Sequence, residues 1–183
     1  PLYSSAASDV YKRQIYSKDH GKTWNISTLA RTNTTESQVA EVEPGVLMLN
    51  MRDNRGGSRA VSTTTDLGKT WKEHESSRTA LQEPVCMASL ISVKAKENVL
   101  GKDILLFSNP NDAKNRHSIT IKASLDGGVT WLPENQLLLD AGWGWGYSCL
   151  TMIDKETVGI LYESSVAHMT FQAIKLKDII KTK

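Results

Sequence analysis

Short runs of alternating or continuously apolar residues follow one another along the chain, and Gly, Pro, Asp or Asn separates them. Such runs predict β-strands. Alternation is clearest at residues 39–42, and a continuous apolar run covers residues 46–51 after the Pro44-Gly45 turn. Further strands are expected at residues 58–64, 84–93, 103–109, 117–124, 136–139, 149–153, 157–162 and 169–176, with a charged outer strand and linker at 72–81. The only helical signal is a possible turn at residues 177–181, so the pattern predicts an all-β protein.

An eight-residue motif interrupts these strands three times. Its pattern is hydroxyl-x-Asp-x-Gly-x-Thr-Trp, and the copies occupy residues 17–24, 64–71 and 124–131. Asp and Gly suit a tight hairpin turn, Thr can start the next strand, and Trp can fill an apolar layer. We therefore interpret the three aspartates as turn residues: Asp19, Asp66 and Asp126. A repeat of roughly 50–60 residues fits one four-stranded blade of a β-propeller, with extra length in loops.

The first residues differ from the rest of the chain. Residues 1–14 have no clear period and lead straight into a strand at residues 15–17. They resemble translated adapter sequence, so we leave them out of the fold prediction. The expectation is a truncated protein whose residues 15–183 form about three four-stranded antiparallel blades. A strand remnant at their start would have no preceding strand to pair with.

Composition and charge narrow the possible functions. The net charge is +2 and Lys and Arg are scattered, which gives no electrostatic footprint for nucleic acid or an anionic membrane. No apolar run approaches the roughly 20 residues of a membrane-spanning helix. Cys86 and Cys149 lie in apolar runs, where free cysteines are expected. No metal or other cofactor is predicted, because the histidines lack metal-ligand spacing: His20, His74, His117 and His168.

Four polar residues lie beside predicted strands in a recognisable order. Glu36 stands in Glu-Ser-Gln, Arg52 follows the 46–51 strand, Arg116 precedes the 117–124 strand, and Tyr147 stands in Gly-Tyr-Ser-Cys. With the three turn motifs, this order and spacing resemble the sialidase (neuraminidase) family over residues 15 to about 176. The resemblance implies the C-terminal half of a six-bladed propeller. It also implies an exo-α-sialidase that releases terminal sialic acids from glycoproteins, glycolipids and oligosaccharides.

The resemblance implies a role for each of the four residues. Arg52 and Arg116 match the second and third of three arginines that bind the substrate carboxylate. Tyr147 matches the nucleophile of a retaining mechanism, and Glu36 matches the base that activates it. The family's first arginine and its acid/base aspartate belong to N-terminal blades and have no match in this chain. We therefore expect the chain alone to be inactive.

The chemistry of the substrate favours these residue types. Sialic acid carries a carboxylate on its anomeric carbon, so an Asp or Glu nucleophile would approach a like charge, whereas a phenol is neutral until it reacts. A phenol with an ordinary pKa of about 10 needs a base at neutral pH. Arginine pairs with a carboxylate through two parallel hydrogen bonds and stays charged.

Alternatives stay open for the two catalytic residues. Tyr147 could be an aromatic residue packed among glycines, and Glu163 could replace Glu36 as its partner. The whole chain could also be a non-catalytic propeller that binds glycan or protein. An Arg-Ile-Pro motif followed by an aspartate in upstream sequence would favour the enzyme over the binding module.

Alternatives also remain for the binding residues. Arg55 and Arg59 compete with Arg52, whereas Arg116 has no close rival. Trp143 and Trp145 could line a site for the leaving group or could pack within their loop. Linkage preference and localisation are not predicted, although a bacterial sialidase would be expected in the periplasm, at the cell surface or secreted.

Overall fold

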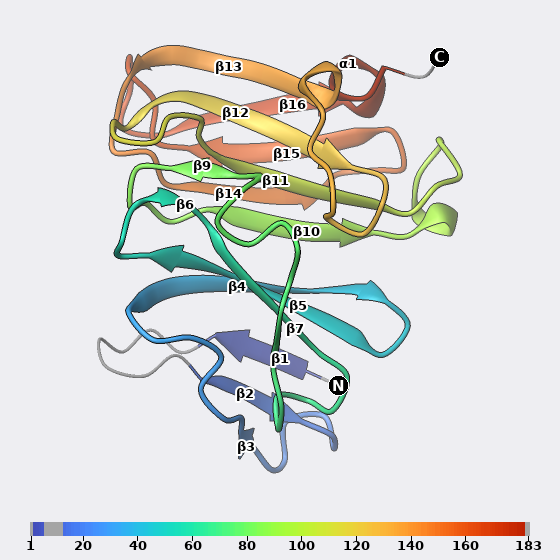
Figure 1. The fold of residues 1–183 in the computed structure, drawn as a ribbon. Helices are drawn as coiled ribbons and strands as arrows, with labels where there is room; N and C mark the ends of the chain where they lie inside the picture. Colours follow the sequence, from blue (N-terminus) through green and yellow to red (C-terminus); the bar gives the residue numbers. More distant parts are fainter. Residues whose placement is uncertain (1, 6–12, 182–183) are drawn as a thin grey trace.

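The computed structural model describes residues 2–5 and 13–181, and almost all of its regular structure is antiparallel β-sheet. Within these residues, four sheets of three or four strands follow one another in chain order (Figure 1). The first sheet contains β1 (Leu2–Ser5), β2 (Gln14–Ser17) and β3 (Asn25–Ile26). The second contains β4 (Thr34–Glu43), β5 (Val46–Asp53), β7 (Ala60–Thr64) and β8 (Lys72–Glu73).

The third and fourth sheets complete the series. The third contains β10 (Ser89–Val93), β11 (Ile104–Pro110), β12 (His117–Ser124) and β13 (Gln136–Trp143). The fourth contains β14 (Ser148–Met152), β15 (Thr157–Tyr162) and β16 (Thr170–Lys175). A ribbon of β6 (Gly57–Ser58) and β9 (Gln82–Glu83) lies between the second and third sheets in the chain. In residues 2–5 and 13–181, helical structure is limited to α1 (Leu176–Ile179) and two 3₁₀ turns. The all-β prediction is confirmed.

The strand count differs from the expected three four-stranded blades plus a remnant. The second and third sheets have four strands each, whereas the first and fourth have three among the described residues. After β16 the chain turns into α1, whose Leu176 and Ile179 are buried, instead of adding a strand. The expected 72–81 strand shrinks to Lys72–Glu73, because Arg78 and Leu81 hydrogen-bond to the backbone of Arg59.

The first sheet corrects a second expectation. Strand β2 was expected to have no preceding partner, but β1 pairs with it from Leu2 opposite Ser17 to Ser5 opposite Gln14. Strand β1 comes from the segment that the prediction left out as adapter-like. Residues 1 and 6–12 of that segment lie outside the described residues, and its origin stays a prediction.

Consecutive sheets pack face to face, so alternate residues of one strand enter different apolar layers. In β5, Leu49 and Met51 belong to the layer that also contains Trp71, whereas Met48 belongs to the next layer. In β11, Leu105 and Phe107 share that next layer with Met48. All seven residues of β11 are buried, as expected for a strand covered on both faces.

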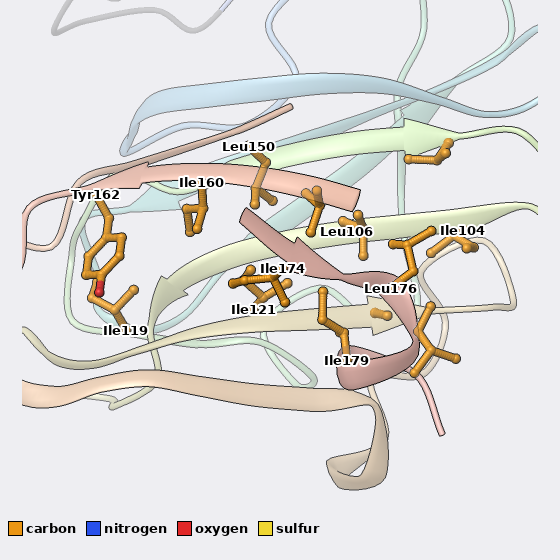
Figure 2. Close-up of a cluster of buried hydrophobic side chains, with 14 residues drawn as sticks. Ile104, Leu106, Ile119, Ile121, Leu150, Ile160, Tyr162, Ile174, Leu176 and Ile179 are labelled. Carbon is orange, nitrogen blue, oxygen red and sulfur yellow. The ribbon is translucent and has the colours of Figure 1, made fainter. Parts of the chain in front are cut away.

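The largest layer lies between the third and fourth sheets, and α1 closes one end of it. Figure 2 shows its aliphatic side chains pointing toward one another from both sheets and from α1. Its labelled members include Ile104, Leu106, Ile119, Ile121, Leu150, Ile160, Tyr162, Ile174, Leu176 and Ile179. Burial of such side chains is the main stabilising term for the fold.

The three repeated motifs form nearly identical turns. In each, the aspartate accepts hydrogen bonds from the first hydroxyl residue and from the threonine; in the first, Ser17 donates to Asp19 at 2.8 Å and Thr23 donates at 2.6 Å. Hydrogen bonds from Thr23 and Ser17 lower the pKa of Asp19 to about 2. The interpretation of the aspartates as turn residues is confirmed.

The motif tryptophans are not equivalent. Trp131 is 7% exposed and makes an edge contact with Phe107, whereas Trp24 is 49% exposed, contrary to prediction. Each later motif packs against the preceding sheet: the Trp71 indole donates to the Thr28 carbonyl at 3.2 Å, and Gly128 lies against Met48. No sheet precedes the first one among the described residues, so nothing there covers Trp24 in the same way.

Replacing Gly128 by alanine should destabilise the protein more than replacing Gly127. Both glycines have positive φ, +91° and +70°, and would be strained as alanine. A Cβ at Gly128 would also lie 2.8 Å from Met48 Cε, whereas a Cβ at Gly127 meets nothing within 4 Å. We expect Gly128→Ala to cost about 1–3 kcal/mol more than Gly127→Ala in denaturant unfolding. Equal costs would show that the motif does not pack tightly against the second sheet.

Candidate active site

Glu36 and Arg52 lie opposite each other on the hairpin of β4 and β5. Thr34 pairs with Asp53 and Ser37 pairs with Met51, so the register shifts between them. Glu36 lies in this irregularity, and such bulges redirect side chains. Arg52 Nη1 donates to Glu36 Oε2 at 2.6 Å, with the two side chains 20% and 27% exposed.

Tyr147 enters the site from a tightly packed turn before β14. Gly146 has φ +88°, and a Cβ there would lie 2.6 Å from the Pro110 side chain. Glu163, just after β15, holds the backbone of Tyr147 through two hydrogen bonds. The Tyr147 N–H donates to Glu163 Oε2 at 2.9 Å, and the Glu163 N–H donates to the Tyr147 carbonyl at 2.9 Å. The positive φ of residue 146 and the close approach of Pro110 both require glycine at this position.

These elements bring three of the four predicted residues into direct contact. The Tyr147 hydroxyl donates to Glu36 Oε1 at 2.5 Å, and Arg52 Nη1 lies 3.3 Å from the same hydroxyl. Glu163 contacts the backbone of Tyr147 and not its hydroxyl. Of the two carboxylates that the sequence left open, Glu36 is therefore the one placed to accept the phenolic proton.

Arg116 lies beside Tyr147 without a polar contact to its hydroxyl. Its Nη1 and Nη2 each donate at 3.0 Å, to the carbonyls of Trp145 and Val85 respectively. Its guanidinium carbon is 5.9 Å from the centre of the Tyr147 ring, within range of a cation–π contact. No sequence pattern pointed to the two carbonyls, because any residue could supply them.

The rival arginines lie elsewhere. Arg55 faces Asp53 and the Thr32 carbonyl, and Arg59 is fully buried against Glu83. Arg52 is thus the one of the three that contacts Tyr147.

Charge sets the protonation of the central pair. Burial raises the pKa of Glu36, but hydrogen bonds from Tyr147 and Arg52 outweigh it and hold the pKa below its ordinary value. Burial, together with the hydrogen bond to Glu36 and its charge, raises the pKa of Tyr147 above 10.0. At neutral pH the site therefore holds a neutral phenol beside an ionised carboxylate, which can act as a base.

Two tryptophans border the site. Trp143 and Trp145 are 67% and 71% exposed, so packing within the loop does not bury them. They line a surface depression of about 340 Å³ together with residues 164–168. The Trp143 ring lies 5.4 Å from the His117 ring.

Residues 2–5 and 13–181 contain no cluster of three or more His, Cys, Asp or Glu side chains that could hold a metal ion. None of the helices in these residues is long and apolar enough to cross a membrane.

Comparisons with known proteins point to one family. The BNR repeat-like domain family matches residues 1–160. A sialidase of Bacteroides fragilis (strain YCH46) is 80% identical over 167 residues, which cover 91% of this chain and 31% of that protein. A sialidase of Micromonospora viridifaciens is 33% identical over 162 residues, covering 87% of this chain and 24% of that protein.

Solved structures give the same picture. The Hadza microbial sialidase Hz136 superposes with a TM-score of 0.90 at 73% identity, covering 93% of this chain and 33% of that one. This agreement confirms the predicted propeller architecture. The chain spans a third or less of the length of each of these three relatives.

Removing the Glu36 charge should lower the pKa of Tyr147. The carboxylate disfavours a phenolate beside it, whereas the Arg52 charge favours one. In Glu36→Gln the phenol should titrate at lower pH than in the parent protein, as followed by the near-ultraviolet absorbance of phenolate. Tyr147→Phe identifies the signal, and Glu41→Gln, on the same strand, is the control. An unchanged titration in Glu36→Gln would contradict the arrangement.

Proposed function

Because the chain belongs to the BNR repeat-like domain family and the three relatives compared above are sialidases, we propose that it forms the C-terminal part of a retaining exo-α-sialidase propeller. The substrates would be sialylated glycoproteins, glycolipids and oligosaccharides. Residues 15–183 would supply the nucleophile, its base and two carboxylate-binding arginines. The first arginine and the acid/base aspartate would come from parts of the protein outside this chain.

One observation carries the proposal: a neutral phenol donates a 2.5 Å hydrogen bond to an ionised carboxylate, which also pairs with an arginine. A binding module has no need for this arrangement. A nucleophilic hydroxyl needs an adjacent base, and the base needs a partner that fixes its orientation. Glu36 and Arg52 supply these two functions.

In the proposed first step, the Tyr147 oxygen attacks the anomeric carbon of sialic acid. Glu36 takes the phenolic proton, the bond to the leaving oxygen breaks, and that oxygen receives a proton from the acid/base group. The result is an aryl glycoside, in which the Tyr147 oxygen is bonded to the anomeric carbon. Water then attacks this carbon from the face opposite Tyr147 and gives a proton to the acid/base group. The bond to the Tyr147 oxygen breaks, Glu36 returns its proton to that oxygen, and the two inversions together retain the configuration.

The arginines and tryptophans would orient the substrate. Within the described residues Arg52 donates only through Nη1, so its Nη2 remains for the substrate carboxylate. Arg116, whose guanidinium carbon lies 5.9 Å from the centre of the Tyr147 ring, would bind the same carboxylate. The exposed rings of Trp143 and Trp145 suit stacking against the apolar face of a leaving sugar.

Tyr147→Phe in the full-length protein should nearly abolish sialic acid release. The change removes only the nucleophilic oxygen, so we expect kcat for a fluorogenic sialoside to fall by about 10³-fold or more. Circular dichroism and thermal melting should match the parent protein. Tyr16→Phe, in the first sheet, is the matched control and should keep activity. A wild-type rate in Tyr147→Phe would return Tyr147 to a packing role.

Arg116→Lys should mainly weaken substrate binding. Lysine keeps the charge but loses the planar fork, and its single nitrogen replaces the two nitrogens that now donate separately to the Trp145 and Val85 carbonyls. We expect KM to rise about tenfold or more with a smaller change in kcat. Arg55→Lys provides the control, since Arg55 faces Asp53. If both variants kept the parent KM, Arg116 would have no part in binding.

A further inference from the structure

Arg59 is the bulkiest side chain that is completely buried in the described structure. It lies between β6 and β7, and its Nη1 donates to Oε2 of Glu83, in β9, at 3.0 Å. Both side chains are 0% exposed. Burying two charges costs desolvation that their attraction barely repays, and apolar residues of similar size often stabilise such a place as well. Stability alone therefore does not account for this pair.

Arg59 and Glu83 form hydrogen bonds to β5 on both sides of Arg52. On one side, Arg59 Nε donates to Asn50 Oδ1 at 2.7 Å, and Nη2 donates to the Asn50 carbonyl at 3.3 Å. On the other side, the Asp53 N–H donates to Glu83 Oε1 at 2.7 Å. Arg52 lies between these two attachments, at the end of the strand, so the pair fixes the backbone from which its side chain projects.

The same two side chains also form hydrogen bonds to Cys86, which directly follows the residue whose carbonyl accepts from Arg116. Cys86 N–H donates to Glu83 Oε2 at 3.1 Å, and Arg59 Nη1 donates to the Cys86 carbonyl at 2.8 Å. The preceding residue, Val85, supplies the carbonyl that accepts from Arg116 Nη2. This segment was expected to belong to a strand at residues 84–93, but the strand begins only at Ser89, because Cys86 bonds to the buried pair instead.

Backbone strain at Val85 supports this interpretation. Val85 has φ +53°, which is unusual for a β-branched residue. Such a conformation persists only where the surroundings enforce it, and it is concentrated at functional sites. The bonds from Arg59 and Glu83 to Cys86 enforce it here, with the result that the Val85 carbonyl faces Arg116.

We propose that Arg59 and Glu83 are positioning residues that hold Arg52 and Arg116 at the spacing required to bind one carboxylate. Neither residue contacts the substrate itself, because both are fully buried. The role rests on the proposed sialidase function. It adds Glu83, which the sequence did not mark, and it gives Arg59 a role other than the carboxylate binding for which it competed with Arg52.

The test uses the full-length protein and the variant Glu83→Gln. The amide keeps an oxygen that can accept from the Asp53 N–H. It loses the negative charge and the second oxygen, which accepts hydrogen bonds from Arg59 and from the Cys86 N–H. Sialic acid and its methyl ester, which lacks the carboxylate charge, are compared as inhibitors of fluorogenic sialoside hydrolysis. We expect KM to rise about tenfold or more, and the preference for the free acid over the ester to fall by a similar factor.

A double variant keeps the proposal testable if Glu83→Gln does not fold. Arg59→Met combined with Glu83→Leu removes both charges of the pair, so neither is left buried without its partner, and the variant should fold. It should nevertheless show the raised KM and the reduced acid preference. Glu156→Gln, which alters an exposed pair with Lys175, is the control and should change neither.

The outcomes distinguish failure of the positioning role from failure of the proposed function. A merely structural pair would lower the melting temperature or the folded fraction but leave KM and the acid preference unchanged; that result in the folded variants would overturn the positioning role alone. If the parent protein neither hydrolysed sialosides nor preferred the free acid, the proposed function would fail, and the positioning role with it.

Discussion

Each sheet must cover its apolar faces with its neighbours, and this constraint brings together the site residues that come from different sheets. Glu36 and Arg52 come from the second sheet, Arg116 directly precedes β12 of the third, and Tyr147 lies in the turn before β14 of the fourth. The layers around Met48 and Phe107, and around Leu106 and Ile160, hold these sheets against one another. The site is thus a product of sheet packing, and a shift of one sheet would separate its residues.

At the site, burial and hydrogen bonding have opposite effects on the pKa of Glu36. Burial alone would favour the protonated form of Glu36, but the phenol and the guanidinium reverse the direction. The same contacts keep Tyr147 protonated. The arrangement therefore keeps a neutral phenol and an ionised carboxylate side by side, and the Arg52 guanidinium pairs with the negative charge.

The sequence contained most of the architecture and the identity of the central residues, because both rest on local patterns. Alternation and short apolar runs predicted most of the strands but missed β1, β3 and β9, and the threefold motif predicted the propeller repeat. What the sequence did not contain was context: Trp24 and Trp131 have the same motif but different neighbours, and one is exposed while the other is buried. The roles assigned to Glu36, Arg52, Arg116 and Tyr147 stay predictions. The buried contacts of Arg59 and Glu83 could not be predicted, since they join a strand to an irregular segment whose path depends on them.

The separation of Tyr147 and Glu36 along the chain has a consequence for folding. The turn motifs close between residues only two to four positions apart, whereas the hydroxyl and the carboxylate meet across 111 residues. Contacts between distant segments carry a larger loop-closure cost and form only when the intervening sheets have docked. A nascent or partly docked chain can therefore contain intact hairpins before the Tyr147 hydroxyl has reached the Glu36 carboxylate. Chemical competence would then be among the last properties that the folding chain acquires.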